Sequence, residues 1–357
     1  MSDSGRSKRT TFGRRILTDN TAIFRLRDIE NRLAEEGTPD QGPQGRQAPP
    51  APPALPPALP PSAFDEPTGS VEINLEETQF TVQEELLTAP SMTKPQPGSG
   101  GHLLAFFSAK GGVGSTTLSL HVAETLATLG YRVCVVDMDL QMGSAAYCLN
   151  METSRSIANL ARSIREGNDA VADFPIAQHE SGVYVLDQPD LSEIETLGSE
   201  GLPSVLKELK RSFDYVLVDG LRDFGDHALL SMDEADRIVM VITQHVPALR
   251  CGIRALELFR RLGYAAGRIS LLMNQYSDQD GDFLDAVQSA YGRPINWMIP
   301  SIVELPDCAN TGQLLRTFAP DSKGNAVIEN LTRSMVGLPP VEVPKRGFFA
   351  KLFSRGS

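Results

Sequence analysis

Apolar and polar residues follow two different patterns along the chain, and the pattern changes near residue 100. From residue 102 onward, short and nearly unbroken apolar runs alternate with segments of helical character. Strands that are buried on both faces have such runs, and intervening helices connect them in parallel. The pattern predicts one doubly wound α/β domain with a mostly parallel sheet over about residues 101–338. The predicted strands are LLAFFSA, RVCVVDMD, GVYVLDQ, DYVLVDG, DRIVMVIT and RISLLMN, and the predicted helices include residues 116–129 and LPSVLKELKRS.

The first hundred residues lack this alternation and predict a largely disordered N-terminal arm, residues 1–100. Residues 22–36 place apolar side chains at helical spacing, which predicts one short amphipathic helix, either a docking element or an isolated frayed helix. Residues 43–61 are dense in proline and predict an extended spacer, because proline has no backbone N–H to donate. Residues 65–87 contain seven acids and no Lys or Arg, which predicts disorder or folding on a partner.

Composition excludes several classes of protein. The 357 residues carry a formal net charge of -12, so a chain-wide basic footprint for nucleic acid is missing. The four cysteines stand far apart without a CxxC motif, which predicts buried, reduced thiols in a cytoplasmic protein. No apolar run approaches the roughly 20 residues that span a bilayer. The basic N-terminus has no apolar run behind it, so it does not predict a secretory signal.

The segment SAKGGVGSTT, Ser108–Thr117, has the features of a phosphate-binding loop. It follows a predicted strand and opens a predicted helix, which is the context that such a loop requires. Its glycines allow a tight turn close to phosphate oxygens, and N–H groups at the helix start form an anion nest. The general pattern GxxxxGK[ST] has a lysine after the last glycine. Here that position is Ser115, whereas Lys110 opens the loop.

This combination resembles the deviant Walker A loop of the ParA/MinD superfamily (SIMIBI-like P-loop NTPases), in which an early lysine is the signature. The resemblance implies ATP and Mg²⁺ as cofactors and a homodimer with nucleotide sandwiched between the subunits. It also implies that Lys110 is a catalytic residue that reaches phosphate across the dimer. The nucleotide-binding residues implied by the match are Lys110, Gly111, Gly112, Val113, Gly114, Ser115, Thr116 and Thr117.

Acids at the ends of two predicted strands extend the resemblance. In VVDMDLQMGS, Asp137 ends a strand and Asp139 follows, where the family uses acids for Mg²⁺ and the attacking water. In DYVLVDG, Asp219 resembles the Walker B acid, which can hold a Mg²⁺-bound water. The implied metal residues are therefore Thr116, Asp137 and Asp219, and Asp139 is the implied catalytic acid. The chain continues with GLRD, where the family usually has proline.

A further resemblance concerns the strand RISLLMN. It ends at Asn274, where the family uses an asparagine amide to read adenine; the alternative is an ordinary turn residue.

Within the superfamily, four segments resemble the CpaE/TadZ ATPases of tight-adherence pilus assembly. They are the phosphate loop, VVDMDLQMGS, residues 233–262 and IPSIVELPDCANTGQLL. This resemblance implies a localisation and assembly factor for a type IV (Flp) pilus or a type II-like secretion system. Its partners would be pilus and secretion assembly proteins, and its location would be polar. Many members carry a receiver-like N-terminal domain, which residues 1–100 cannot form because they lack apolar strands.

The serine at position 115 predicts weakened catalysis. A hydrogen bond to a charged group contributes about 1.5–3 kcal/mol, so its loss would weaken ATP binding roughly 10- to 150-fold. Phosphoryl transfer also loses charge stabilisation in the transition state. We therefore predict a slow or inactive ATPase in which nucleotide binding is weakened less than hydrolysis. The alternatives are an active MinD/ParA-type positioning or partitioning ATPase and a nucleotide-free scaffold.

Two other members of the superfamily serve as comparisons. A nitrogenase-type iron–sulfur reductase needs cysteines at the dimer face, and no cysteine here has a suitable position. A DNA-partitioning protein needs basic patches. Five arginines recur in one region, but the chain is acidic overall, so DNA is not an expected partner. These arginines are Arg250, Arg254, Arg260, Arg261 and Arg268.

Residues 339–357 form a separate basic tail, which ends in VPKRGFFAKLFSRGS. At about 100° per residue, its aromatic and aliphatic side chains fall on one side of a helix and cations on the other. This pattern predicts a helix lying on an anionic inner-membrane surface, and it resembles the membrane-targeting tail of MinD. Docking on the protein's own domain or on another protein is the alternative. The candidate membrane-binding residues are Lys345, Arg346, Phe348, Phe349, Lys351, Leu352, Phe353 and Arg355.

Overall fold

The computed structural model describes residues 100–152, 155–167, 171–190, 192–277 and 281–341. The predictions for the N-terminal helix at 22–36, the proline-rich spacer at 43–61, the acidic segment at 65–87 and the membrane-binding residues 345–355 lie outside these described residues.

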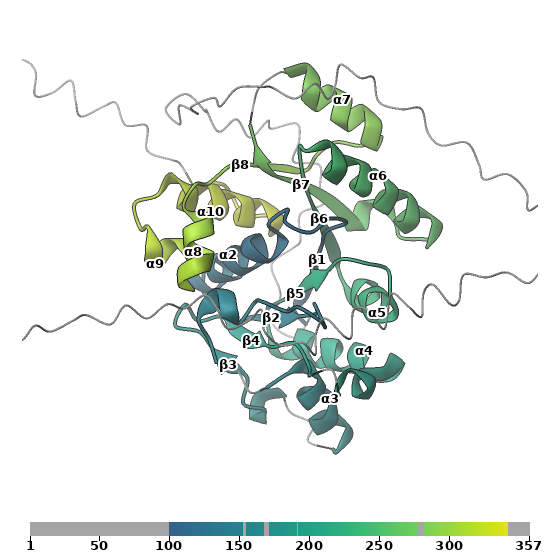
Figure 1. Ribbon diagram of the computed structural model, residues 1–357. Helices are drawn as coiled ribbons and strands as arrows, with labels where there is room; N and C mark the ends of the chain where they lie inside the picture. Colours follow the sequence, from purple (N-terminus) through teal and green to yellow (C-terminus); the bar gives the residue numbers. More distant parts are fainter. Residues whose placement is uncertain (1–99, 153–154, 168–170, 191, 278–280, 342–357) are drawn as a thin grey trace, which may run out of the picture. The chain divides into compact units, whose positions relative to one another are not determined.

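An eight-stranded sheet forms the centre of the described domain, in the order β3-β4-β2-β5-β1-β6-β7-β8. All neighbouring strands pair in parallel except β3 and β4, which are antiparallel. This arrangement confirms the predicted doubly wound, mostly parallel sheet (Figure 1). The strands are β1 (His102–Phe107), β2 (Val133–Asp137), β3 (Ala177–Gln178), β4 (Tyr184–Leu186), β5 (Tyr215–Leu221), β6 (Arg237–Thr243), β7 (Ile269–Tyr276) and β8 (Trp297–Pro300).

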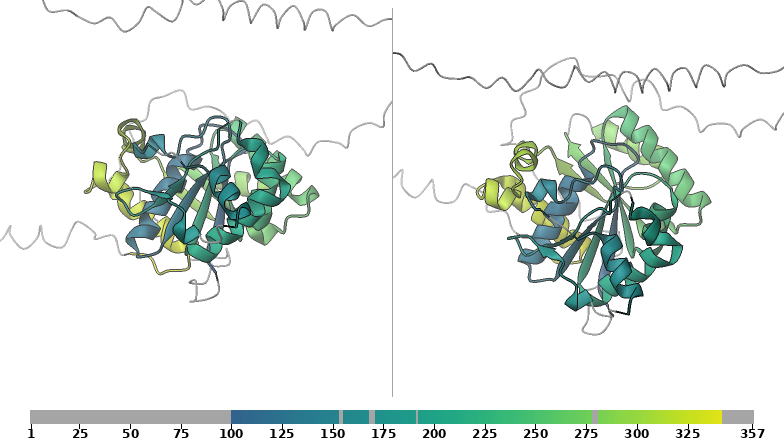
Figure 2. Two further views of the ribbon diagram at one scale, coloured as in Figure 1. Left: turned by 90° about the horizontal axis from the view of Figure 1, so that it is seen from below. Right: turned by 60° about the horizontal axis from the view of Figure 1, so that its bottom comes forward.

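Helices cover both faces of the sheet because its strands are apolar on both sides. In β1, Leu103, Ala105 and Phe107 belong to one core and Leu104 and Phe106 to the other. One face packs against α2 and α10, and the other against α3 to α7 (Figures 1 and 2). The helices are α2 (Ser115–Thr128), α3 (Ile157–Arg165), α4 (Ile194–Ser212), α5 (Asp226–Glu234), α6 (Val246–Arg261), α7 (Gly281–Tyr291), α8 (Leu305–Thr311), α9 (Leu315–Phe318) and α10 (Lys323–Met335).

The strand order predicts a ligand site at the carboxyl ends of the central strands. After β1 the chain passes over β5 to reach β2, and it later returns to form β6 on the other side of β1. Ligands of doubly wound sheets bind at the carboxyl ends of the strands where the order reverses in this way. At that edge the last residue of β2, Asp137, pairs in register with Asp219 of β5. The two predicted metal residues are therefore neighbours across two strands.

The helix that follows the phosphate loop is anchored to the C-terminal helices through His121. His121 is buried in α2, and its Nε2 accepts a hydrogen bond from the Leu315 N–H at 3.1 Å. Its Nδ1 lies 2.7 Å from the Thr117 carbonyl oxygen. An acceptor at Nε2 and a donor at Nδ1 require the neutral ring. Burial favours the same state, because it lowers the pKa of His121.

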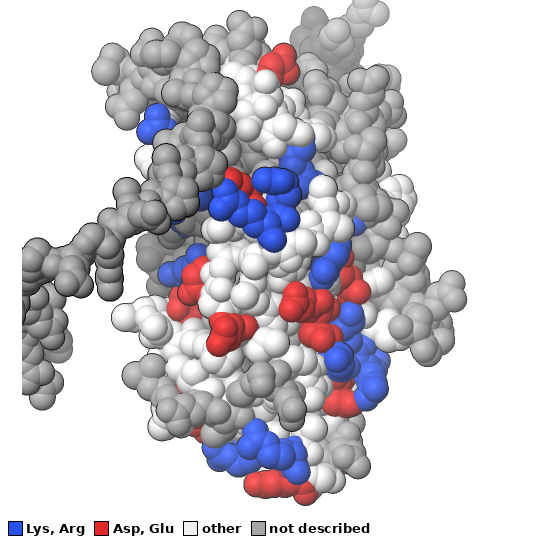
Figure 3. All heavy atoms as spheres, turned by 90° about the vertical axis from the view of Figure 1, so that its right-hand side faces the viewer, with Lys and Arg blue, Asp and Glu red and all other residues white. Residues whose placement is uncertain are grey.

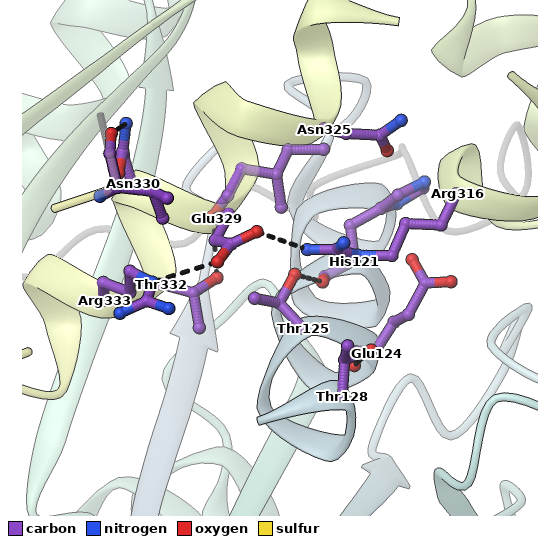
Figure 4. A network of polar contacts seen from close by, with 12 residues as sticks. His121, Glu124, Thr125, Thr128, Arg316, Asn325, Glu329, Asn330, Thr332 and Arg333 are labelled. Atoms are coloured by element: carbon purple, nitrogen blue, oxygen red, sulfur yellow. Dashed lines mark hydrogen bonds and ion pairs between the residues drawn. The ribbon is translucent and has the colours of Figure 1, made fainter. Parts of the chain in front are cut away.

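Charged groups surround this contact. Glu329 of α10 forms ion pairs with Arg316 and Arg333, both at 3.0 Å (Figure 4). Glu124 of α2 is buried, and burial raises its pKa to about 7 although Arg316 opposes the shift. The phosphate-loop helix therefore packs against α9 and α10 through a polar network as well as through the apolar core.

The cysteine predictions are confirmed in part. All four thiols are free, and Cys134 and Cys308 are buried. The prediction of burial was wrong for Cys148 and Cys251, which are partly exposed. Cys148 lies in a single 3-10 turn at Tyr147–Leu149, and Cys251 lies on surface helix α6, where neither is fully covered. Among the described helices, none is both long and apolar enough to cross a membrane.

Candidate nucleotide-binding site

The phosphate loop joins the end of β1 to the start of α2. Ser108 N–H donates to the Leu221 carbonyl at 2.9 Å, which ties the loop entrance to the end of β5. Gly112 and Gly114 adopt φ angles of 81° and 85°, which suit glycine. Gly114 caps α2 without a side-chain bond, and the first turn of the helix contains no acid. The N–H groups of this turn, together with the helix dipole, therefore favour an anion at this point.

Three loop residues carry the predicted chemistry. Lys110 is exposed at the loop entrance. The Ser115 hydroxyl oxygen is buried and has no hydrogen-bond partner among the described residues. The Thr116 hydroxyl lies close enough to Asp219 to stabilise its carboxylate. The loop therefore keeps its predicted shape around a serine that cannot supply the charge of the usual lysine.

Two buried carboxylates lie at the carboxyl edge of the sheet. Asp137 accepts hydrogen bonds from Asp139 N–H and Ala145 N–H, both at 3.0 Å. Burial and the charge of Asp219 nevertheless raise the pKa of Asp137 to about 6. Burial also raises the pKa of Asp219, although the hydroxyls of Thr116 and Ser119 oppose the shift. A bound cation would relieve the electrostatic cost of both groups.

The segment after β2 is held against the end of β5. Met138 N–H donates to the Asp219 carbonyl at 2.9 Å, and Asp139 Oδ1 accepts from Met142 N–H at 3.1 Å. Gly143 N–H donates to Gln188 Oε1 at 2.6 Å. Sequence reasoning did not single out Gln188, because its role depends on the spatial approach of two distant loops.

Asn274 lies beneath the phosphate loop. It is 5 % exposed, and its Nδ2 donates to the Val113 carbonyl at 2.9 Å. Its Oδ1 accepts from Gln275 N–H at 2.9 Å. A Cβ atom on Gly114 would lie 2.5 Å from Asn274 Nδ2, so the loop glycine and the amide fit closely together. The structure gives Asn274 a loop-supporting contact, and adenine recognition by this residue stays a prediction.

The site fits a nucleotide with Mg²⁺ on the evidence of its unpaired oxygens. Ser115 Oγ and Asp219 Oδ1 are buried and form no hydrogen bond with the described residues. Both belong to the loop and strand ends described above. No cluster of three or more His, Cys, Asp or Glu among the described residues could hold a metal ion alone. Mg²⁺ does not need one, because it usually binds through one or two carboxylates together with waters and phosphates.

Comparison with known proteins finds similar sequences and similar folds. Residues 101–261 match the family model of an AAA domain. The septum site-determining protein MinD of Thermotoga maritima is 24% identical over 244 residues, covering 66% of this chain and 89% of that protein. A ParA family ATPase from Chlorobium tepidum has a TM-score of 0.60 at 21% identity, covering 65% of this chain and 98% of its own. MinD of Pyrococcus horikoshii, solved as a complex with Mg-ADP, has a TM-score of 0.55 at 22% identity, covering 65% and 95%.

The described domain has the ParA/MinD-type P-loop fold. The family model and the MinD relative also support the ParA/MinD P-loop superfamily. An arginine, Arg222, follows strand β5 in this fold. Arg222 Nη2 lies 2.8 Å from Asp139 Oδ2. Sequence reasoning noted GLRD only as a departure from the family, although an arginine next to a phosphate site was the available signal.

The arginines considered for DNA binding do not form one free basic surface on the ParA/MinD-type domain. Arg268 donates to the carbonyls of Met232 and Ala235, and Arg261 pairs with Glu257. Arg250, Arg254 and Arg260 are exposed. On the face that Figure 3 shows, Lys and Arg lie interspersed with Asp and Glu. The expectation that DNA is not a partner stays a prediction.

Proposed function

We propose that this protein is an ATP-dependent switch of the ParA/MinD type, in which bound nucleotide pairs two copies and hydrolysis is slow. The observation that carries the proposal is a pair of buried oxygens, Ser115 Oγ and Asp219 Oδ1, which form no hydrogen bond with the described residues. Burying polar oxygens without partners is costly, so these atoms are best explained by a polar ligand. The open N-terminus of α2 supports phosphate as part of that ligand.

In this proposal each residue has a separate task. The N–H groups of the loop and of the first turn of α2 bind phosphate oxygens. Thr116, Asp137 and Asp219 would hold Mg²⁺, directly or through water, and the ion would supply positive charge next to the phosphates. Asp139 orients the attacking water, and Lys110 reaches the nucleotide of the partner subunit. The missing lysine at position 115 weakens the stabilisation of the transition state more than it weakens binding.

The cellular task follows from the finer resemblance. We propose that the switch localises and helps to assemble a tight-adherence pilus, as in the CpaE/TadZ branch. The sequence segments quoted for that branch support this proposal. The matched MinD and ParA proteins support the broader class of positioning ATPases and do not themselves concern pili. The N-terminal arm would recruit assembly components, and the protein would act from the cytoplasm at the inner membrane.

Replacing Lys110 by alanine is expected to abolish nucleotide-driven pairing. Light scattering should show that Mg-ATP doubles the mass of the wild-type protein and leaves the Lys110→Ala variant monomeric. The matched control is Lys323→Ala, an exposed lysine at the start of α10, which should pair as the wild type does. A wild-type protein that binds no nucleotide at millimolar ATP would contradict the switch and favour a scaffold.

Removing residues 345–357 is expected to abolish binding to vesicles that contain anionic lipid. One short amphipathic segment binds weakly, whereas two in a dimer bind together through their effective concentration. Co-sedimentation should therefore require both the tail and ATP. The Lys110→Ala variant, which keeps the tail, should show only the weak binding of a monomer. An unchanged bound fraction after truncation would exclude the tail as the membrane anchor.

A further inference from the structure

We propose that Arg222 is a phosphate-binding residue that supplies the positive charge missing at position 115. This inference rests on the proposed function and adds to it a residue that the general phosphate-loop pattern does not include. The need for such a residue follows from the charges in the site. Asp137, Asp139 and Asp219 already bring three acids to one edge of the sheet, and a nucleotide adds further negative charge. Ser115 contributes none to balance them.

The position of Arg222 follows from the strand that precedes it. β5 ends at Leu221, whose carbonyl accepts the N–H of Ser108 at the entrance of the phosphate loop. On its other side β5 pairs with β2, and the Asp219 carbonyl accepts the N–H of Met138. Arg222 therefore leaves the sheet between the phosphate loop and the segment that contains Asp139.

The side chain of Arg222 is directed toward the candidate site. Its Nη2 lies 2.8 Å from Asp139 Oδ2. Its charge also reaches Asp219, since the guanidinium is one of the groups that counteract the raised pKa of that acid. Arg222 thus lies within electrostatic range of both the predicted catalytic acid and the predicted Walker B acid.

The ion pair with Asp139 is a poor explanation for Arg222 on grounds of stability. The Arg222 side chain is 48% exposed, and partly exposed pairs contribute little to folding. Asp139 Oδ2 forms no hydrogen bond of standard geometry, so the pair is not a well-formed fork. A guanidinium has five N–H donors and matches phosphate oxygens in a bidentate manner. Arg222 can therefore bind phosphate while Asp139 holds it at the site.

The test is a double-mutant cycle on ATP affinity, measured by titration calorimetry of the full chain with Mg-ATP. Arg222→Ala should weaken binding about 10- to 150-fold, the usual range for a hydrogen bond to a charged group. Ser115→Lys should strengthen binding in the wild type and rescue most of the loss in Arg222→Ala. In the Ser115→Lys background, Arg222→Ala should cost less than about threefold, because the lysine now supplies the charge.

Controls separate this inference from the proposed function. Arg132→Ala removes an exposed, acid-paired arginine, which lies beside the amino end of β2, and should leave ATP affinity unchanged. If the wild type binds ATP and Arg222→Ala binds it equally well or more tightly, Arg222 is not a phosphate ligand. If Arg222→Ala weakens ATP binding by the same factor with serine and with lysine at position 115, Arg222 does not replace the lysine. If the wild type binds no ATP, the proposed function fails, and this inference fails with it.

Discussion

Gly220→Ala is expected to lower the free energy of unfolding by about 3 kcal/mol and to abolish nucleotide binding. Gly220 has a φ of 84°, and alanine in this region costs about 1–2 kcal/mol. An added methyl group would also lie 2.7 Å from Asp139 Cβ and 2.9 Å from its Cα. Overpacking of this kind costs roughly 1–3 kcal/mol. Relief of the clash would move Asp139 away from β5, where Met138 N–H bonds to Asp219.

Gly263→Ala is the matched control for this prediction. Gly263 has a φ of 85°, but an added methyl group would meet no atom within 4 Å. It should therefore lose only the backbone contribution, about 1–2 kcal/mol, and keep its ATP affinity. Urea unfolding followed by circular dichroism gives both values. Equal losses in the two variants would show that β5 and the Asp139 segment are not in close contact.

Much of the sheet could be predicted because its strands are long apolar runs. β1, β2, β5, β6 and β7 each have a buried sequence bounded by polar residues, and the acids at the ends of β2 and β5 follow directly. β3 has two residues and β8 has four, and neither was predicted, whereas β4, with three, was recognised within the run GVYVLDQ. Helix α4 begins at Ile194, ahead of the predicted segment that starts at Leu202.

The contacts that complete the site could not be predicted, because they join positions that are far apart in the sequence. Arg222 meets Asp139 only because β2 and β5 are neighbours in the sheet. Likewise, His121 and Leu315 are separated by 194 positions. The amide of Asn274 was assigned to adenine from its place in a series of motifs, and only the fold shows its contact with Val113. A pattern of residue types predicts which groups gather at a strand edge but not how they pair there.

Asp219→Asn is expected to stabilise the fold and to remove the Mg²⁺ dependence of nucleotide binding. The Asp219 carboxylate is 1% exposed, and its Oδ1 has no hydrogen-bond partner among the described residues. A neutral amide of the same shape removes the cost of a buried charge, so we expect a gain of about 1–3 kcal/mol in unfolding free energy at pH 8. Without the carboxylate, Mg²⁺ should no longer strengthen ATP binding, a loss of at least about tenfold, the size of one charged hydrogen bond.

The pH dependence of this stabilisation has a definite sign. Burial raises the pKa of Asp219, so the folded protein binds this proton more tightly than the unfolded chain does. The contribution of Asp219 to the stability of the wild type therefore falls as pH rises above about 4, the ordinary pKa of an aspartate, and the advantage of the variant grows over the same range. Thermal unfolding from pH 5 to 8 measures this trend. Asp321→Asn, at an exposed acid before α10, should change stability by less than about 0.5 kcal/mol at every pH. A variant at position 219 that loses stability while it keeps its response to Mg²⁺ would show that Asp219 supports the fold and does not serve the ion.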